Sequence, residues 1–241
     1  MLEWEQKKDE GKPMIKTVLL DLDDTILDFH ASEAVAIVKT FEALGVPCDK
    51  AWLGRYSDIN LEQWRLLETG AFTRDEILVR RFRLLYEEMG IEVDPEETQA
   101  LYAKNLGLTH FFVTDAKETL DALYERYDLY LVTNGIAAVQ DPRLEASGIL
   151  PYFKGVFISE RVGYMKPQKE YFDRVFHTIG EEKRMSSVIV GDSLTSDILG
   201  GMNAGIPTIW FNLRGNPPRP DIVPTATITA LKDLIPAIEA L

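Results

Sequence analysis

The sequence contains a single cysteine, Cys48, among its 241 residues. One cysteine cannot form an intramolecular disulfide, and it excludes a zinc site built from several cysteines. Basic residues are also scarce, since 26 Lys and Arg stand against 39 Asp and Glu, and the formal net charge is −13. Nucleic-acid backbones and anionic membranes both bind basic patches, so the charge predicts that neither is a partner. It still allows a small phosphorylated metabolite that binds together with a divalent cation.

Long apolar runs, repeats and low-complexity segments are absent as well. No apolar stretch approaches the roughly 20 residues of a membrane-spanning helix, and no signal peptide is visible. The polar segment 1–13 lies outside the pattern of the remaining chain, so we expect an extension there and a domain that begins at Met14. We expect a cytoplasmic protein that is either a monomer or a homodimer.

Short apolar runs recur along the chain, and helical periodicity follows each of them. Runs of this kind are typical of buried parallel strands. Their alternation with helices predicts an α/β fold with a doubly wound, mostly parallel Rossmann-like sheet. The five runs are Thr17–Asp21, Leu129–Thr133, Val156–Ser159, Ser187–Gly191 and Thr208–Phe211.

The region between the first two runs departs from this alternation. Residues 31–114 contain helical patterns and no convincing strand, and they include a capping box formed by Thr73 and Glu76. A crossover in such a sheet needs only a dozen or so residues. We therefore expect an inserted all-helical domain at 31–114, and a catalytic core formed by 14–30 and 115–241.

Two carboxylates and a hydroxyl close the first predicted strand, at Asp21, Asp23 and Thr25. A buried strand has little use for acids at its end unless they hold a charge, a metal or a reacting group. Two such acids can act as nucleophile and as general acid/base. The alternative is that these residues only cap the helix that follows.

Three further polar groups follow later predicted strands. Thr133-Asn134-Gly135 offers a hydroxyl and backbone N–H groups for a phosphoryl oxygen, although Asn-Gly is also a common turn. Lys166 stands before Pro167, which we expect to open a helix, and a cation at a helix N-terminus needs an anion nearby. Asp192 and Asp197 are hard oxygen ligands of the kind that suits Mg²⁺. Each signal is weak alone, but together they predict one phosphate and metal site.

This ordered set of residues resembles the haloacid dehalogenase (HAD) superfamily, and the resemblance extends over nearly the whole chain from Met14. Segment 31–114 is similar to the cap domain of that superfamily. The resemblance implies that Asp21 is the nucleophile and Asp23 the general acid/base. It implies that Thr133 and Lys166 bind the transferring phosphoryl group. Mg²⁺ would be held by Asp21, the Asp23 carbonyl and Asp192, with support from Asp197.

Asp23 further separates two branches of this superfamily. The dehalogenase branch lacks an acid at this position, because a carbon–halogen bond needs no protonated leaving oxygen, whereas ester cleavage does. The resemblance therefore implies a Mg²⁺-dependent phosphomonoester hydrolase that forms an aspartyl-phosphate intermediate.

Substrate choice is expected in the cap, where Asn60 and Trp64 lie four residues apart on one helix face. An amide and an indole could read and stack a planar base, although Trp64 could also belong to the cap core. Together with Gly70-Ala71-Phe72-Thr73 and Arg81-Phe82, this segment resembles pyrimidine 5′-nucleotidase-type members. Nucleoside 5′-monophosphates are thus the expected substrates.

Two other functions remain open. One is a sugar-phosphate or sugar-acid phosphatase of the same superfamily, similar to N-acylneuraminate-9-phosphatase. The other belongs to a different class, because a non-catalytic phosphoacceptor or partner-binding module can also combine acids, a threonine and a lysine on a parallel sheet. Release of phosphate from a generic ester would separate the enzyme from such a module.

Overall fold

The computed structural model describes residues 14–241. Six parallel strands form one sheet in the order β3-β2-β1-β4-β5-β6, so the predicted fold class is confirmed. The five predicted strands are present, and the unpredicted β6 is too short to show any periodicity. The strands are β1 (Thr17–Leu20), β2 (Asp128–Thr133), β3 (Gly155–Ile158), β4 (Ser187–Gly191), β5 (Thr208–Phe211) and β6 (Ala226–Ile228).

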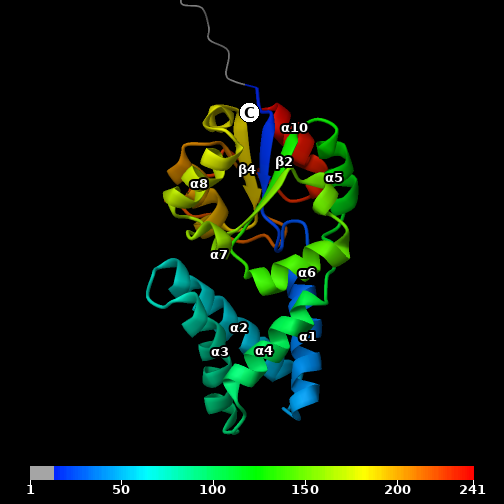
Figure 1. Ribbon diagram of the computed structural model, residues 1–241, viewed down its shortest axis with the longest axis vertical. Coiled ribbons are helices and arrows are strands. Elements are labelled where there is room, and N and C mark those ends of the chain that lie inside the picture. The colour runs from blue at the N-terminus through cyan, green and yellow to red at the C-terminus, as the bar shows by residue number, and fades with distance from the viewer. Residues whose placement is uncertain (1–13) are drawn as a thin grey trace, which may run out of the picture.

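Helices cover both faces of the sheet because successive strand residues point to opposite sides. Val18 and Leu20 of β1 pack on the face covered by α5 (Ala116–Tyr124) and α10 (Leu234–Glu239). Leu19 packs on the other face, against α8 (Lys169–Ile179) and α9 (Leu199–Ala204). Figure 1 shows α5 and α10 on one side of the strands and α8 on the other. This two-sided burial explains why the strands are continuous apolar runs.

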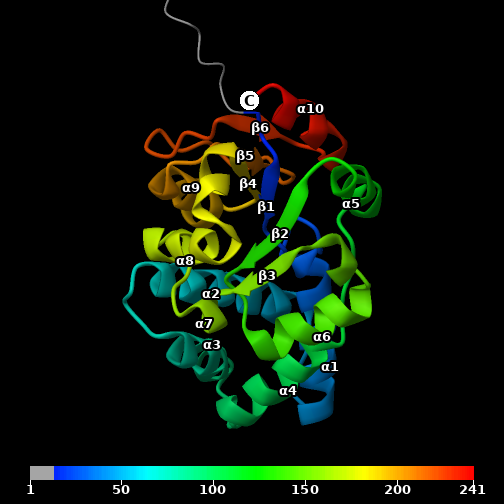
Figure 2. The same cartoon turned by 45° about the horizontal axis from the view of Figure 1, so that its top comes forward.

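Four helices separate β1 from α5, in the region predicted to be inserted. They are α1 (Phe29–Leu44), α2 (Lys50–Glu68), α3 (Arg74–Met89) and α4 (Pro95–Gly107). These helices share an aromatic core in which the Tyr56 and Phe82 rings stack with centroids 5.3 Å apart. We call them the cap helices. The strands point toward them (Figure 1), and α2 lies beside the strand ends in Figure 2 as well.

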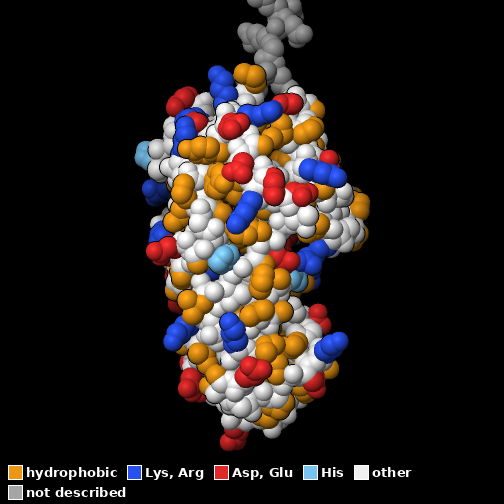
Figure 3. All heavy atoms as spheres, turned by 90° about the vertical axis from the view of Figure 1, so that its right-hand side faces the viewer, with side chains coloured by type: hydrophobic (Ala, Val, Ile, Leu, Met, Phe, Trp, Pro, Cys, Tyr) orange, Lys and Arg blue, Asp and Glu red, His pale blue; other side chains and the backbone are white. Residues whose placement is uncertain are grey.

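The domain boundaries stay a prediction, and the expected extension at 1–13 lies outside the described residues. The remaining short elements are α6 (Ala137–Ser147), α7 (Ser159–Val162), one π-helical turn (Leu194–Ile198) and three 3₁₀ turns (Leu150–Tyr152, Glu181–Ser186 and Leu231–Asp233). None of the described helices is both long and apolar enough to cross a membrane. In Figure 3, acidic and basic side chains are interspersed with apolar ones, so the negative net charge does not form a single acidic face in that view.

Two local expectations are wrong. The sequence places Asp115 three residues before Glu118, a spacing that predicts a capping pair at the start of α5. The Asp115 backbone is instead left-handed (φ 64°), and its side chain makes no capping hydrogen bond. Pro167 was expected to be the first residue of a helix, but α8 begins at Lys169. Pro167 instead lies in a turn that the Gln168 N–H closes by donating to the Met165 carbonyl at 2.8 Å. The capping box of Thr73 and Glu76 is confirmed.

Candidate active site

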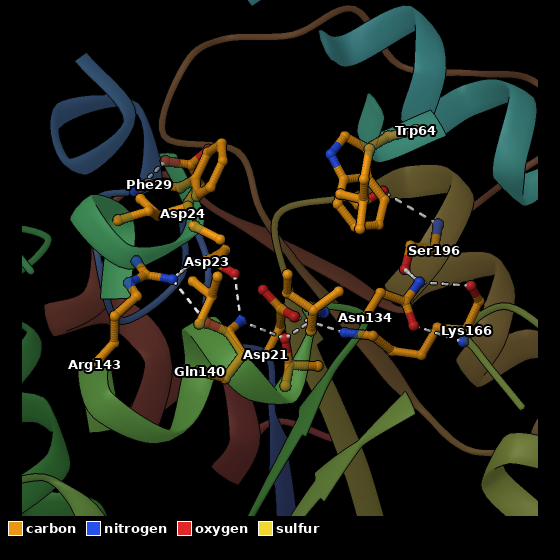
Figure 4. Close-up of a pocket in the computed structure, with 18 of the residues that line it drawn as sticks. Asp21, Asp23, Asp24, Phe29, Trp64, Asn134, Gln140, Arg143, Lys166 and Ser196 are labelled. Carbon is orange, nitrogen blue, oxygen red and sulfur yellow. Dashed lines mark hydrogen bonds and ion pairs between the residues drawn. The ribbon is translucent and has the colours of Figure 1, made fainter. Parts of the chain in front are cut away.

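The candidate residues converge because the strands that carry them are parallel and in register. Leu20 of β1 lies beside Leu131 of β2 and Val190 of β4. The residues that follow these three positions therefore emerge at one edge of the sheet, where open α/β sheets bind their ligands. Figure 4 shows Asp21, Asp23, Asn134 and Lys166 around one cavity at this edge. The structure thus brings the predicted core residues together.

Lys166 is the buried cation of this site, with 1% of its surface exposed. Its Nζ lies 2.6 Å from Asp21 Oδ1 and 2.6 Å from Asp197 Oδ1, and it donates to the Val132 carbonyl at 2.9 Å. Burial acts to lower the pKa of Lys166, but the charges of Asp197 and Asp21 outweigh it and hold the pKa above its usual value. The anions that Lys166 needs are thus two carboxylates.

A cluster of three carboxylates lies beside this lysine. One oxygen from each of Asp21, Asp192 and Asp197 lies within 4.8 Å of the others. Burial raises the pKa of Asp192 well above its usual value, and the charges of Asp21 and Asp197 raise it further. Burial also raises the pKa of Asp21, although the charge of Lys166 opposes this. A divalent cation with hard oxygen ligands would relieve this repulsion, so the residues fit Mg²⁺.

Asp197 is held in place by its neighbours. It is 1% exposed, and Ser193 donates its backbone N–H to Oδ2 at 3.1 Å while Lys166 binds Oδ1. The close approach depends on Gly191, because a Cβ at that position would lie 2.2 Å from Asp197 Cγ. The strand must therefore end in glycine for Asp197 to support the site.

Two residues of α6 hold Asp23, and neither was predicted from the sequence. Gln140 donates Nε2 to Asp23 Oδ2 at 2.7 Å and to Thr133 Oγ1 at 3.0 Å. Arg143 donates Nη1 to Asp23 Oδ1 at 2.5 Å, and its side chain is fully buried. In the sequence the two residues look like part of a polar surface helix. The only available signal was their position directly after the β2 end.

The polar residues after β1 and β2 divide between ligand binding and loop positioning. Thr25 donates Oγ1 to Asp21 Oδ2 at 3.3 Å. Asn134, expected to bind phosphate, exchanges two hydrogen bonds with the backbone of Lys166, at 2.8 and 2.9 Å. Its side-chain amide therefore fixes the Lys166 loop, and the Thr133 hydroxyl and Lys166 remain as candidate phosphate ligands.

The cavity has a volume of about 220 Å³ and extends from Asp21 up to the cap helices. Trp64 lines it and also packs against the buried cluster of Leu67, Ile77 and Leu78. Figure 4 draws Phe29 and Trp64 on either side of the space above Asp21. Asn60 does not line the cavity. It is 4% exposed, with its amide bonded to Glu33 and Arg81, so the expected direct contact of Asn60 with a base does not agree with the geometry. Other cap residues on the cavity wall are Glu68, Leu78, Arg81, Gln99, Tyr102, Ala103 and Leu106.

Comparisons with known proteins identify the family of this chain. The profile of the haloacid dehalogenase-like hydrolase family matches residues 15–205. A protein of Bacillus subtilis named as a HAD-hydrolase, YfnB, is 42% identical over 91% of this chain and 93% of its own length. A crystal structure of YfnB with magnesium bound, described as revealing interdomain movement, has a TM-score of 0.90 at 40% identity and covers 93% of this chain and 99% of that one.

Two relatives are named as pyrimidine 5′-nucleotidases. PynA of Streptococcus pneumoniae is 36% identical over 93% of this chain and 95% of its own length. YjjG of Escherichia coli is 30% identical over 90% of this chain and 95% of its own length. The chain belongs to the haloacid dehalogenase-like hydrolase family, as one of its phosphatases.

Proposed function

We propose that this phosphatase hydrolyses nucleoside 5′-monophosphates, with pyrimidine bases foremost, through a phosphorylated Asp21. The observation that carries the proposal is that Trp64 lines the same cavity as Asp21, Asp23 and Lys166. One cavity can therefore hold a phosphoryl group at the sheet edge and a planar base at the cap. The names of PynA and YjjG point in the same direction.

The first half-reaction follows from the positions of the charged groups. A carboxylate oxygen of Asp21 attacks phosphorus, a P–O bond to Asp21 forms, and the ester P–O bond breaks. Asp23, held by Gln140 and Arg143, gives its proton to the departing alkoxide. Lys166 lies against Asp21 and offsets the negative charge that accumulates on the phosphoryl oxygens.

The second half-reaction reverses the role of Asp23. Asp23 takes a proton from water, the resulting hydroxide attacks phosphorus, and the bond to Asp21 breaks to release phosphate. Mg²⁺ bound by Asp21, the Asp23 carbonyl and Asp192 would supply positive charge that lets an anionic ester approach these carboxylates. Asp197 does not react itself but positions Lys166 by accepting a hydrogen bond from its Nζ.

The proposed leaving group accounts for the apolar cap side of the cavity. Leu78, Ala103 and Leu106 line this side together with Trp64. A base stacked on an indole contributes roughly 1–3 kcal/mol. A small sugar phosphate would make no contact with these apolar side chains.

Trp64→Ala tests the proposal. We expect kcat/KM for uridine 5′-monophosphate to fall about tenfold to a hundredfold, with little change for p-nitrophenyl phosphate, which is too small to need the cap wall. Trp52→Ala is the matched control, because Trp52 lies on the same helix and packs in the cap core away from the cavity.

Two results would contradict the nucleotide proposal. Equal losses of kcat/KM for both substrates in Trp64→Ala would show that Trp64 has a purely structural role. A wild-type preference for sugar or sugar-acid phosphates would favour the other branch, to which the mouse N-acylneuraminate-9-phosphatase, 25% identical, belongs by name.

A further inference from the structure

A chain of hydrogen bonds crosses all four cap helices and ends at the cavity. Glu33 of α1 accepts from Asn60 Nδ2 of α2 at 2.7 Å. Asn60 Oδ1 accepts from Arg81 Nη1 of α3 at 2.6 Å. Arg81 Nη2 in turn donates to Gln99 Oε1 of α4 at 2.6 Å. We call these four residues the cap relay. Glu33, Asn60 and Arg81 are buried and Gln99 is partly exposed. Arg81 and Gln99 both line the cavity.

Arg81 is fixed within this relay. It is 3% exposed, its Nε donates to the Leu78 carbonyl at 3.1 Å, and its guanidinium carbon lies 4.8 Å from the centroid of the Tyr102 ring. Every hydrogen-bonding direction used here leads to a neighbour within the cap. Arg81 is therefore a rigid support for the residue it binds.

The chemistry of arginine determines which way the Gln99 amide faces. A guanidinium only donates hydrogen bonds, so the amide oxygen of Gln99 must face Arg81 and the NH₂ group must face away from it. Among residues 14–241, no group accepts a hydrogen bond from Gln99 Nε2. Because Gln99 lines the cavity, its NH₂ group is an oriented donor that a ligand bound there can use.

We infer that Gln99 reads the base of the substrate, by donating Nε2–H to a carbonyl oxygen or ring nitrogen on the base edge. The 2-carbonyl shared by uracil and cytosine is such an acceptor. This inference rests on the proposed nucleotide function. It gives Asn60 an indirect role, since Asn60 holds Arg81 and Arg81 holds Gln99.

Gln99→Glu is the sharpest variant, because a carboxylate keeps an acceptor for Arg81 and removes the donor. Gln99→Met removes the donor without adding charge. Both variants should lower kcat/KM for uridine 5′-monophosphate about tenfold or more, since an unpaired polar group on the base is penalised. Both should leave ribose 5-phosphate unchanged, because that substrate has the same phosphorylated sugar and no base.

The two substrates separate failure of the inference from failure of the proposed function. Suppose that the wild-type enzyme prefers the nucleotide. If the Gln99 variants then lose activity equally on both substrates, or lose none on either, the role of Gln99 alone is overturned. A wild-type enzyme that prefers ribose 5-phosphate would overturn the nucleotide function itself. Melting temperatures of both variants within a few degrees of wild type would show that the cap is intact. If the melting temperature of Gln99→Met falls much further, the activity comparison is made with Gln99→Glu.

Discussion

At the scale of single residues, the acid Asp23 depends on support from outside its own strand. Asp23 lies beyond the end of β1 at Leu20, and 26% of its side chain is exposed. Gln140 and Arg143 bind one oxygen each. Gln140 also binds Thr133, which couples the position of the acid to that of a candidate phosphate ligand. We expect Gln140 to act as a positioning residue.

The leaving group provides a test of these roles. Asp21→Asn should abolish turnover, and Asp23→Asn should lower kcat/KM for an alkyl phosphate on the order of a hundredfold or more. Gln140→Leu should cause a smaller loss, about tenfold. In Asp23→Asn and Gln140→Leu, p-nitrophenyl phosphate should lose less, because p-nitrophenolate departs without a proton. Losses independent of the leaving group would exclude a role in its protonation.

At the scale of elements, acidic side chains fix the start of α1, where the chain passes from the sheet into the cap. Asp28 accepts from the Ala31 N–H at 2.9 Å, as an N-cap. Asp24 accepts from the Phe29 N–H at 3.0 Å and lies 2.6 Å from Nδ1 of His30. The hydrogen bond to Asp24 raises the pKa of His30, although partial burial opposes it. The His30–Asp24 pair therefore stabilises this junction more when the imidazole is charged.

The sign of this pKa shift predicts how stability varies with pH. The stabilisation is fully present below the unfolded pKa of about 6.5 and is lost as the pH rises through the higher folded pKa. His30→Ala should lower the free energy of unfolding at pH 6, by under about 1 kcal/mol because the side chain is half exposed, and have less effect at pH 8. Urea unfolding at both pH values measures this, with the exposed His177→Ala as control. An effect of His30→Ala that grew with pH would contradict the assignment.

At the scale of the molecule, the cap helices and the sheet edge enclose the site together. Leu67 and Leu78 of the cap pack in one apolar cluster with Ile136 and Met165 from the loops after β2 and β3. Arg74 of α3 donates Nη2 to Ser159 Oγ at 2.6 Å. Asp21 and Asp197 at this edge are buried, which raises the cost of leaving their charges unbalanced. A bound cation should therefore affect the whole fold.

Metal removal should reduce activity and stability together. EDTA should abolish phosphatase activity, and added Mg²⁺ should restore it. At a concentration a hundred times its Kd, Mg²⁺ should stabilise the fold by about 2.7 kcal/mol, seen as a rise in Tm. Asp192→Asn should lose most of this rise. Full activity of a metal-free preparation, or an undiminished rise in Asp192→Asn, would refute the metal assignment.

The sequence by itself determined the sheet and the core of the site. Continuous apolar runs specify strands that are buried on both faces. Parallel strands bring their carboxyl ends to one edge of the sheet, so the local pattern alone predicted that Asp21, Thr133 and Asp192 lie at that edge. The sequence also assigned Lys166 to this edge, although the helix after it begins later than expected.

Only the tertiary structure decided what supports and shapes that site. Gln140 and Arg143 reach Asp23 across 117 and 120 positions of the chain, and Gln99 meets Arg81 from another helix. A polar residue on a helix has the same local signature whether it faces water or a buried acid. Its role depends on which side chain of another element lies opposite, and the packing of the elements alone sets that pairing. For the same reason Asn60 and Trp64, four residues apart on α2, separate into a buried support and a cavity wall.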